Sequence, residues 1–146
     1  MKILVLGRRE VNKITEDNIS IPHDIISIST PGDKHIIYPE NKFRQRMLQI
    51  FFDDLDPMKK IDEEEIEKKL KRKIILFDKN LAKTILDFIN EDNFLLCQCD
   101  AGISRSAGVA AAISKIFNGD DQFFFKRYAP NRHVYNTILS YYFLKE

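Results

Sequence analysis

Several kinds of residue are scarce in this sequence of 146 residues. It has no tryptophan, only two cysteines, and a formal net charge of +1 from 23 basic and 22 acidic side chains. Because the positive and negative charges nearly cancel, the protein has no long-range electric field that would attract nucleic acid or a membrane surface. We expect neither as a partner. Because Cys97 and Cys99 are separated by a single residue, they cannot build a disulfide framework, which is typical of a reducing compartment.

Long apolar runs are also missing, and we expect no secretory signal. The longest apolar stretches, such as Ile3–Leu6 and Phe94–Cys97, are far shorter than the roughly 20 residues that cross a bilayer. The apolar run after Lys2 ends at Gly7 and is followed by Arg8 and Arg9, before the apolar core of a signal could form. We therefore expect a soluble, cytoplasmic protein whose length fits a single domain over residues 1–146.

Short apolar runs that end in turn residues predict four buried strands. These runs are Ile3–Leu6, Ile25–Ser29, Met47–Phe52 and Phe94–Gln98. Helical spacing of apolar residues predicts one helix after Asp78, its N-cap, and further helices over residues 106–117, 120–128 and from Pro130 onward. Strands separated by helices favour a single α/β domain with a mainly parallel sheet of four or five strands flanked by helices.

Residues 62–73 form a highly charged stretch. Glu64 and Lys68, Glu65 and Lys69, and Glu67 and Lys71 are each spaced i,i+4, which favours a solvated helix or insertion. A docking surface for a partner is the alternative interpretation.

The most informative segment follows the fourth predicted strand. It starts at Cys99 and continues as Asp-Ala-Gly-Ile-Ser-Arg-Ser to Ser106, where a helix is expected. In a strand–loop–helix arrangement, the loop N–H groups and the helix N-terminus form an anion cradle. The same dipoles favour the thiolate form of a cysteine at the start of the loop, and the thiolate is the nucleophile.

The side chains of this loop suit phosphate chemistry. The planar guanidinium of Arg105 can hold two phosphate oxygens at once, and Gly102 allows a tight turn. The Ser106 hydroxyl can donate to the sulfur and stabilise it as a leaving group. We expect the Asp100 side chain to point outward. The predicted phosphate-binding residues are Asp100, Ala101, Gly102, Ile103, Ser104 and Arg105.

Cys99–Ser106 has the pattern C-x5-R-S and resembles the active-site loop of the cysteine-based protein tyrosine phosphatases. The small dual-specificity branch is the most similar in size, and Pro130-Asn131 also resembles that branch. The strong resemblance covers Phe94 to Leu139. It implies a protein tyrosine phosphatase-like fold, a phosphocysteine intermediate and a phosphorylated protein or peptide as substrate. It implies neither a metal nor an organic cofactor, because the loop supplies what Mg²⁺ supplies elsewhere.

One position departs from the family pattern. The family usually has histidine immediately before the nucleophile, and here that position holds Gln98. Glutamine donates and accepts hydrogen bonds but cannot carry charge. We therefore expect a slower enzyme rather than an inactive one.

Phosphoryl transfer to a thiolate also needs an acid for the departing oxygen, and the same group can then activate water. The resemblance places it on a loop after a strand upstream of the nucleophile. Leu48, Ile50 and Phe52 alternate toward Asp53-Asp54-Leu55-Asp56. Asp54 continues that alternation beside an apolar neighbour and is favoured as the acid. The alternatives are Asp53 and Asp56, followed by Asp62 and Asp78.

The second cysteine and the three histidines are best explained as structural residues. Cys97 is expected to be a buried core residue rather than a redox partner of Cys99. His23, His35 and His133 lie far apart and have no metal-ligand spacing, so no metal site is predicted.

Together these residues predict a phosphomonoester hydrolase in which Cys99, Arg105, Asp54 and Ser106 are catalytic. No basic residue lies between Cys99 and Arg105, which in the resembled superfamily disfavours inositol phospholipids and RNA 5′-triphosphates. Phosphotyrosine is the first choice of substrate, with phosphoserine or phosphothreonine next. A non-catalytic, phosphate-binding pseudophosphatase is the main alternative, and sulfur transfer of the rhodanese type is a weaker one. The physiological substrate and the oligomeric state stay open.

Overall fold

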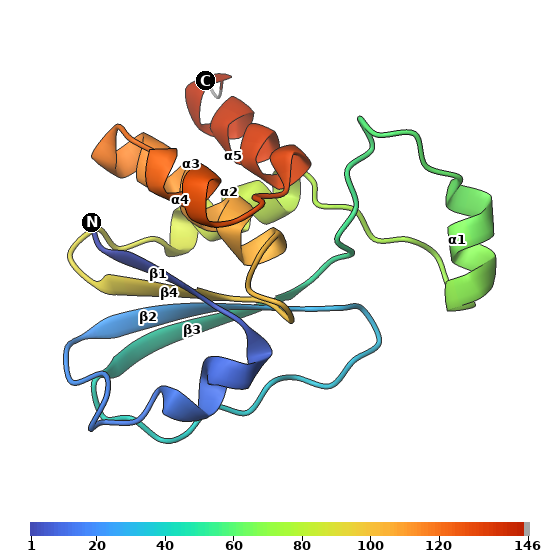
Figure 1. The fold of residues 1–146 in the computed structure, drawn as a ribbon. Helices are drawn as coiled ribbons and strands as arrows, with labels where there is room; N and C mark the ends of the chain where they lie inside the picture. Colours follow the sequence, from blue (N-terminus) through green and yellow to red (C-terminus); the bar gives the residue numbers. More distant parts are fainter. Residues whose placement is uncertain (145–146) are drawn as a thin grey trace.

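Four parallel strands form the centre of the structure (Figure 1). In the computed structural model, which describes residues 1–144, the strands lie in the order β1-β4-β2-β3, and each neighbouring pair is parallel. Their bounds are β1 (Ile3–Leu6), β2 (His23–Ser29), β3 (Arg44–Phe51) and β4 (Phe94–Gln98). The expected α/β fold with a parallel sheet is confirmed. Strands β2 and β3 begin earlier than their apolar runs, because polar residues such as His23 and Arg44 also pair in the ladder.

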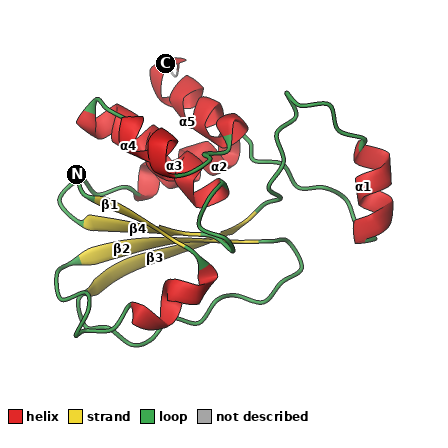
Figure 2. Cartoon of the chain, viewed as in Figure 1, coloured by secondary structure: helices red, strands yellow, loops and turns green. Residues whose placement is uncertain are grey.

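Helices cover one face of this sheet (Figure 2). The helical elements of the described chain are η1 (Arg8–Lys13), α1 (Glu63–Leu70), α2 (Lys79–Phe88), α3 (Arg105–Asn118), α4 (Gln122–Arg127) and α5 (Arg132–Leu144). Helices α2 to α5 lie on one side of the sheet, and the short 3-10 helix η1 lies on the other. The predicted cap of α2 is confirmed, since Asp78 accepts a hydrogen bond of 2.9 Å from the Leu81 N–H.

Side chains of the strands divide between two apolar clusters, one on each face of the sheet. In β2, Ile26 and Ile28 pack toward the helices, whereas Ile25 packs toward η1. In β4, Cys97 belongs to the helix-side cluster and is fully buried. Its expected place in the core is therefore confirmed, and burial raises the pKa of the Cys97 thiol.

Residues 57–73, which we call the excursion, leave the body of the domain between β3 and α2. Helix α1 stands apart from the other helices (Figure 1) and has no buried residue, which confirms the expected solvated helix. The base of the excursion is tied back by Arg72, whose Nη1 and Nη2 donate to the two carboxylate oxygens of Asp53 at 2.9 and 2.8 Å. Asp53 also accepts a hydrogen bond of 2.9 Å from the Ile75 N–H.

The carboxyl ends of all four strands meet at one edge of the sheet, because the strands are parallel. This edge brings together Gly7 after β1, Thr30 after β2, Asp53-Asp54 after β3 and Cys99 after β4. Residues far apart in sequence are thereby collected around the Cys99–Ser106 loop. No helix within residues 1–144 is long and apolar enough to span a membrane.

We predict that Arg72→Ala lowers the free energy of unfolding by about 1–3 kcal/mol at neutral pH, because it leaves a buried carboxylate without its partner. Hydrogen bonds from Arg72 hold the pKa of Asp53 below its ordinary value. This contribution is therefore complete above the unfolded-state pKa of the carboxyl and is lost as the pH falls through the folded-state value.

Urea unfolding of both proteins at neutral and acidic pH checks this prediction. The difference between wild type and Arg72→Ala should shrink in acid. Lys73→Ala is the matched control, because its exposed side chain makes only a 3.8 Å ion pair with Glu67. A difference that stays constant or grows in acid would contradict the assignment.

Candidate active site

The Cys99 thiol lies at the start of the loop between β4 and α3 and is almost completely buried. Its Sγ is 3.1 Å from the Ser106 Oγ, a distance at which the hydroxyl can donate to a thiolate. The Cys99 N–H donates to the Leu6 carbonyl oxygen at 3.2 Å, which ties Cys99 to the end of β1. The sulfur therefore sits in a fixed position at the carboxyl edge of the sheet.

Several backbone N–H groups of the loop donate no hydrogen bond within the described residues. No acceptor within residues 1–144 pairs with the backbone N–H groups of residues 100–104. The loop leads directly into the N-terminus of α3, where the helix dipole favours negative charge. This arrangement of free donors around a thiol is suited to a small oxyanion such as phosphate.

Two glycines allow the loop to approach the end of β1. Gly102 has φ of +71°, and a Cβ at this position would lie 2.4 Å from the Gly7 nitrogen. A Cβ at Gly7 would lie 2.8 Å from the Ala101 carbonyl oxygen. The sequence predicted the tight turn at Gly102 but indicated Gly7 only as the end of a strand, because the contact between them joins distant segments.

Arg105 is buried and holds three strand ends together. Its Nη1 donates to the Phe52 carbonyl oxygen at 2.9 Å and to the Thr30 Oγ1 at 3.2 Å. Its Nη2 lies 3.3 Å from the Asp100 Oδ2. The buried Nε has no hydrogen-bond partner within residues 1–144. An unsatisfied N–H on a buried guanidinium is a donor available to a bound anion.

The side chain of Asp100 does not point outward as expected. Its Oδ2 accepts a hydrogen bond of 3.1 Å from the Thr30 hydroxyl and contacts Arg105, and its Oδ1 is 3.9 Å from Arg8. The expectation was wrong because it considered the loop alone, whereas Thr30 and Arg105 together attract the carboxylate inward. Asp100 therefore orients the guanidinium of Arg105.

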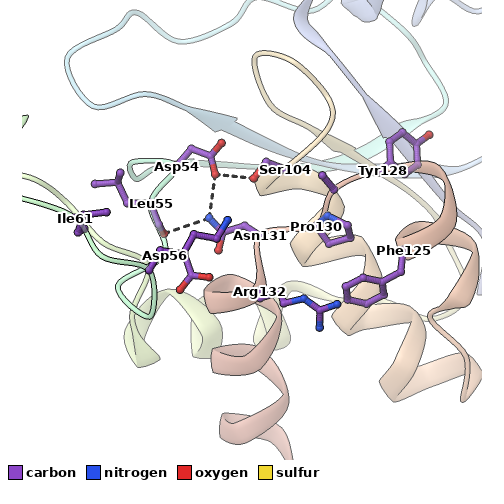
Figure 3. Close-up of a pocket in the computed structure, with 12 residues that line it drawn as sticks. Asp54, Leu55, Asp56, Ile61, Ser104, Phe125, Tyr128, Pro130, Asn131 and Arg132 are labelled. Atoms are coloured by element: carbon purple, nitrogen blue, oxygen red, sulfur yellow. Dashed lines mark hydrogen bonds between the residues drawn. The ribbon is translucent and has the colours of Figure 1, made fainter.

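Asp54 faces the loop across the edge of the sheet (Figure 3). Its Oδ1 accepts hydrogen bonds from the Ser104 hydroxyl at 2.7 Å and from the Asn131 amide at 2.9 Å. Its side chain is otherwise exposed. Both contacts use Oδ1, so Oδ2 accepts no hydrogen bond from residues 1–144.

The alternative acids occupy structural positions. Asp53 is buried and bound to Arg72, which holds its pKa low. Asp56 accepts from the Met58 N–H in a turn. Asp62 and Asp78 cap α1 and α2. Among these five carboxylates, Asp54 is the one whose side chain touches the Cys99–Ser106 loop.

Asn131 connects the candidate acid to the last helix. Besides Asp54, its amide Nδ2 donates to the Leu55 carbonyl oxygen at 3.2 Å, and its Oδ1 accepts from the Val134 N–H at 3.1 Å at the start of α5. Its backbone N–H donates to the Ser104 carbonyl oxygen at 2.9 Å. The sequence indicated Pro130-Asn131 as a helix start but did not predict this bridge, because a cap signal carries no information about distant partners.

Gln98 is buried on the face of the sheet opposite the helices. Its Oε1 accepts hydrogen bonds of 2.7 Å from both the Ser27 and Tyr38 hydroxyls, and its Nε2 has no partner within residues 1–144. Burial raises the pKa of Tyr38 to about 12, so its phenol stays protonated and donates. Gln98 thus anchors the segment between β2 and β3 to the end of β4, next to Cys99.

Within the described residues, no group of three or more His, Cys, Asp or Glu side chains is arranged to hold a metal ion. The free donors described above are the groups that could hold a ligand.

Comparison with known proteins gives matches at the level of fold. No family model and no curated protein sequence matches the chain. The human tyrosine phosphatase-like serine/threonine/tyrosine-interacting protein is similar in structure, with a TM-score of 0.53 and 18% identity over 97% of this chain and 91% of that one. Human DUSP28 is similar with a TM-score of 0.52 and 15% identity over 95% and 90% of the two chains.

The chain therefore shares its fold with these two structures. In this fold it places the C-x5-R-S loop after the central strand β4, between β1 and β2.

We predict that Gly102→Ala is more damaging than Gly119→Ala, although both residues have positive φ, of +71° and +75°. Either alanine loses about 1–2 kcal/mol from the left-handed backbone. Nothing lies within 4 Å of a Cβ at Gly119, whereas a Cβ at Gly102 meets the Gly7 backbone. Only Gly102→Ala should therefore displace the loop.

Urea unfolding and calorimetric binding of vanadate distinguish the two effects. Gly119→Ala should bind vanadate as the wild type does. Gly102→Ala should unfold at a lower urea concentration than Gly119→Ala and should no longer bind vanadate. Equal binding by the two variants would show that the contact with Gly7 does not shape the cradle.

Proposed function

We propose that the protein is a phosphomonoester hydrolase that acts through a phosphocysteine intermediate, with phosphorylated tyrosine in a protein or peptide as the preferred substrate. The observation that carries this proposal is the joint placement of Cys99, Arg105 and Asp54 around the free N–H groups of one loop. It brings a nucleophile, an oxyanion cradle and an acid to the same edge of the sheet.

In the first step, the Cys99 thiolate attacks phosphorus and the bond from phosphorus to the ester oxygen breaks. The loop N–H groups and the Arg105 guanidinium stabilise the negative charge on the three non-bridging oxygens. Asp54 donates its proton to the departing oxygen, so the leaving group is released as a neutral alcohol or phenol. The Asp54 oxygen free of Ser104 and Asn131 is the one placed to deliver it.

In the second step, the Asp54 carboxylate takes a proton from water as the water oxygen attacks phosphorus. The bond between sulfur and phosphorus breaks and inorganic phosphate is released. The Ser106 hydroxyl, 3.1 Å from the sulfur, stabilises the thiolate that leaves. No metal ion enters this scheme.

The residues inside the loop support a phosphoprotein over a polyanionic lipid. Asp100 points its carboxylate toward Arg105, which places negative charge at the edge of the cradle. Additional phosphates on a substrate would be repelled there, whereas a single phosphate is compensated by Arg105. A peptide that carries one phosphate per residue therefore fits this cradle better than an inositol polyphosphate.

We predict that Asp54→Asn reduces turnover of alkyl phosphates by about 100-fold or more, because the alkoxide then leaves without a proton. Activated aryl phosphates, whose leaving groups need little protonation, should lose about tenfold or less. Steady-state kinetics over a series of leaving groups checks this. Asp78→Asn is the matched control, because asparagine caps a helix as well as aspartate does. Equal losses across the series would remove Asp54 from the role of acid.

The alternative is a pseudophosphatase that binds phosphorylated ligands without hydrolysing them, and it is favoured by the absence of the family histidine at Gln98. Turnover of p-nitrophenyl phosphate by the wild type and its disappearance in Cys99→Ser distinguish the two functions. Binding of a phosphotyrosine peptide with no turnover by the wild type would establish the alternative instead.

A further inference from the structure

A pocket of about 520 Å³ adjoins the candidate active site on the side of Asp54 (Figure 3). Asp54 and Ser104 belong to its lining, whereas Cys99 and Arg105 do not. Its other walls come from the beginning of the excursion and from the connection between α4 and α5. The lining residues that bear on a ligand are Asp56, Lys59, Ile61, Phe125, Pro130 and Arg132.

The position of this side pocket relates it to the substrate chain. Asp54 must reach the ester oxygen to protonate it, so the leaving group departs on the side of the loop where Asp54 lies. The side pocket begins at the same residue. Consecutive Cα atoms are about 3.8 Å apart. A side chain one or two residues from the phosphorylated residue can therefore enter the pocket while the phosphate occupies the loop.

The two aspartates that line the pocket accept hydrogen bonds, whereas its two cations form no ion pair within residues 1–144. Asp54 accepts two hydrogen bonds and Asp56 accepts one from the Met58 N–H. Within residues 1–144, neither Lys59 nor Arg132 lies within salt-bridge distance of a carboxylate. When Asp54 carries the proton that the first step requires, the lining has two cations and one anion. The pocket is then positive in the reacting state.

Arg132 is also held in place before a ligand arrives. Its guanidinium carbon lies 4.7 Å from the centroid of the Phe125 ring, so the aromatic face restricts the side chain and leaves its N–H edges free. A planar guanidinium held in this way matches a carboxylate. Leu55, Ile61 and Pro130 supply apolar surface for the methylene groups of a longer side chain.

We propose that the side pocket binds a glutamate or aspartate side chain close in sequence to the phosphorylated residue of a protein substrate, with Arg132 and Lys59 as its anion-binding groups. This proposal rests on the proposed function and narrows its substrate class to phosphorylated residues in an acidic context. The assignment comes from charge complementarity and from the continuity of the pocket with the phosphate site.

The experiment uses phosphotyrosine peptides that carry glutamate, alanine or lysine at each position within two residues of the phosphotyrosine. At one position or more, the wild type should show kcat/KM about three- to tenfold higher for glutamate than for lysine, with alanine between them. The difference should appear in KM and should weaken in high salt. Equal kcat/KM for all three peptides at every position would overturn the proposal.

The variants Arg132→Ala and Lys59→Ala, and the double variant, test whether these two side chains cause the preference for glutamate peptides. The ratio of kcat/KM for the glutamate and lysine peptides is compared within each variant, so a general loss of activity cancels. The double variant should bring the ratio close to one. Lys60→Ala is the matched control, because Lys60 is exposed on the same segment but does not line the pocket. A ratio that persists in the double variant would contradict the proposal.

A failure of the phosphatase assignment can be distinguished from a failure of the side-pocket proposal. If the wild type does not hydrolyse p-nitrophenyl phosphate, the phosphatase assignment fails, and the side pocket is tested by calorimetric binding of the same peptides. Tighter binding of the glutamate peptides, lost in the double variant, would then support the pocket alone. Binding that does not depend on the neighbouring residue would overturn it.

Discussion

The hydrogen bonds of the buried Arg105 guanidinium hold the parts of the site together. The guanidinium joins the Phe52 carbonyl after β3, the Thr30 hydroxyl after β2 and the Asp100 carboxylate in the loop. A buried cation is tolerated only when such partners compensate for lost hydration, which is worth several kcal/mol. Because Phe52 lies just before Asp53-Asp54, the guanidinium that is proposed to hold phosphate also fixes the segment that carries the candidate acid.

The two neighbouring aspartates after β3 differ in burial and in their contacts. Asp53 is buried, accepts hydrogen bonds from Arg72 and Ile75, and its lowered pKa keeps it charged. It fastens the excursion to the domain. Asp54 is exposed and touches Ser104 and Asn131. Of two consecutive aspartates, one therefore forms a structural ion pair and the other contacts the Cys99–Ser106 loop.

Local patterns in the sequence predicted what depends on local physics. Apolar runs predicted the four strands, Asp78 predicted the cap of α2, and the spacing within Cys99–Ser106 predicted the loop. The alternation before Asp53-Asp54 favoured Asp54 as the residue facing the site, and Asp54 does contact the loop. Its catalytic role stays a prediction.

Contacts between distant segments could not be predicted in the same way. Thr30 is 75 residues from Arg105, and Asn131 is 77 residues from Asp54. The approach of Gly7 to Gly102 and the inward turn of Asp100 also depend on how β1 and β2 are placed beside β4. A single sequence does not reveal which strand ends become neighbours in the sheet, so these partners became known only from the fold.

Intact-protein mass spectrometry after acid quenching during turnover decides whether the reaction passes through phosphorylated Cys99. With a good aryl phosphate as substrate, a fraction of the protein should be heavier by one phosphoryl group. Peptide mapping should locate that group on Cys99, and Cys99→Ser should show neither the adduct nor turnover. Hydrolysis that continues in Cys99→Ser, or an adduct on another residue, would rule out a phosphocysteine intermediate at Cys99.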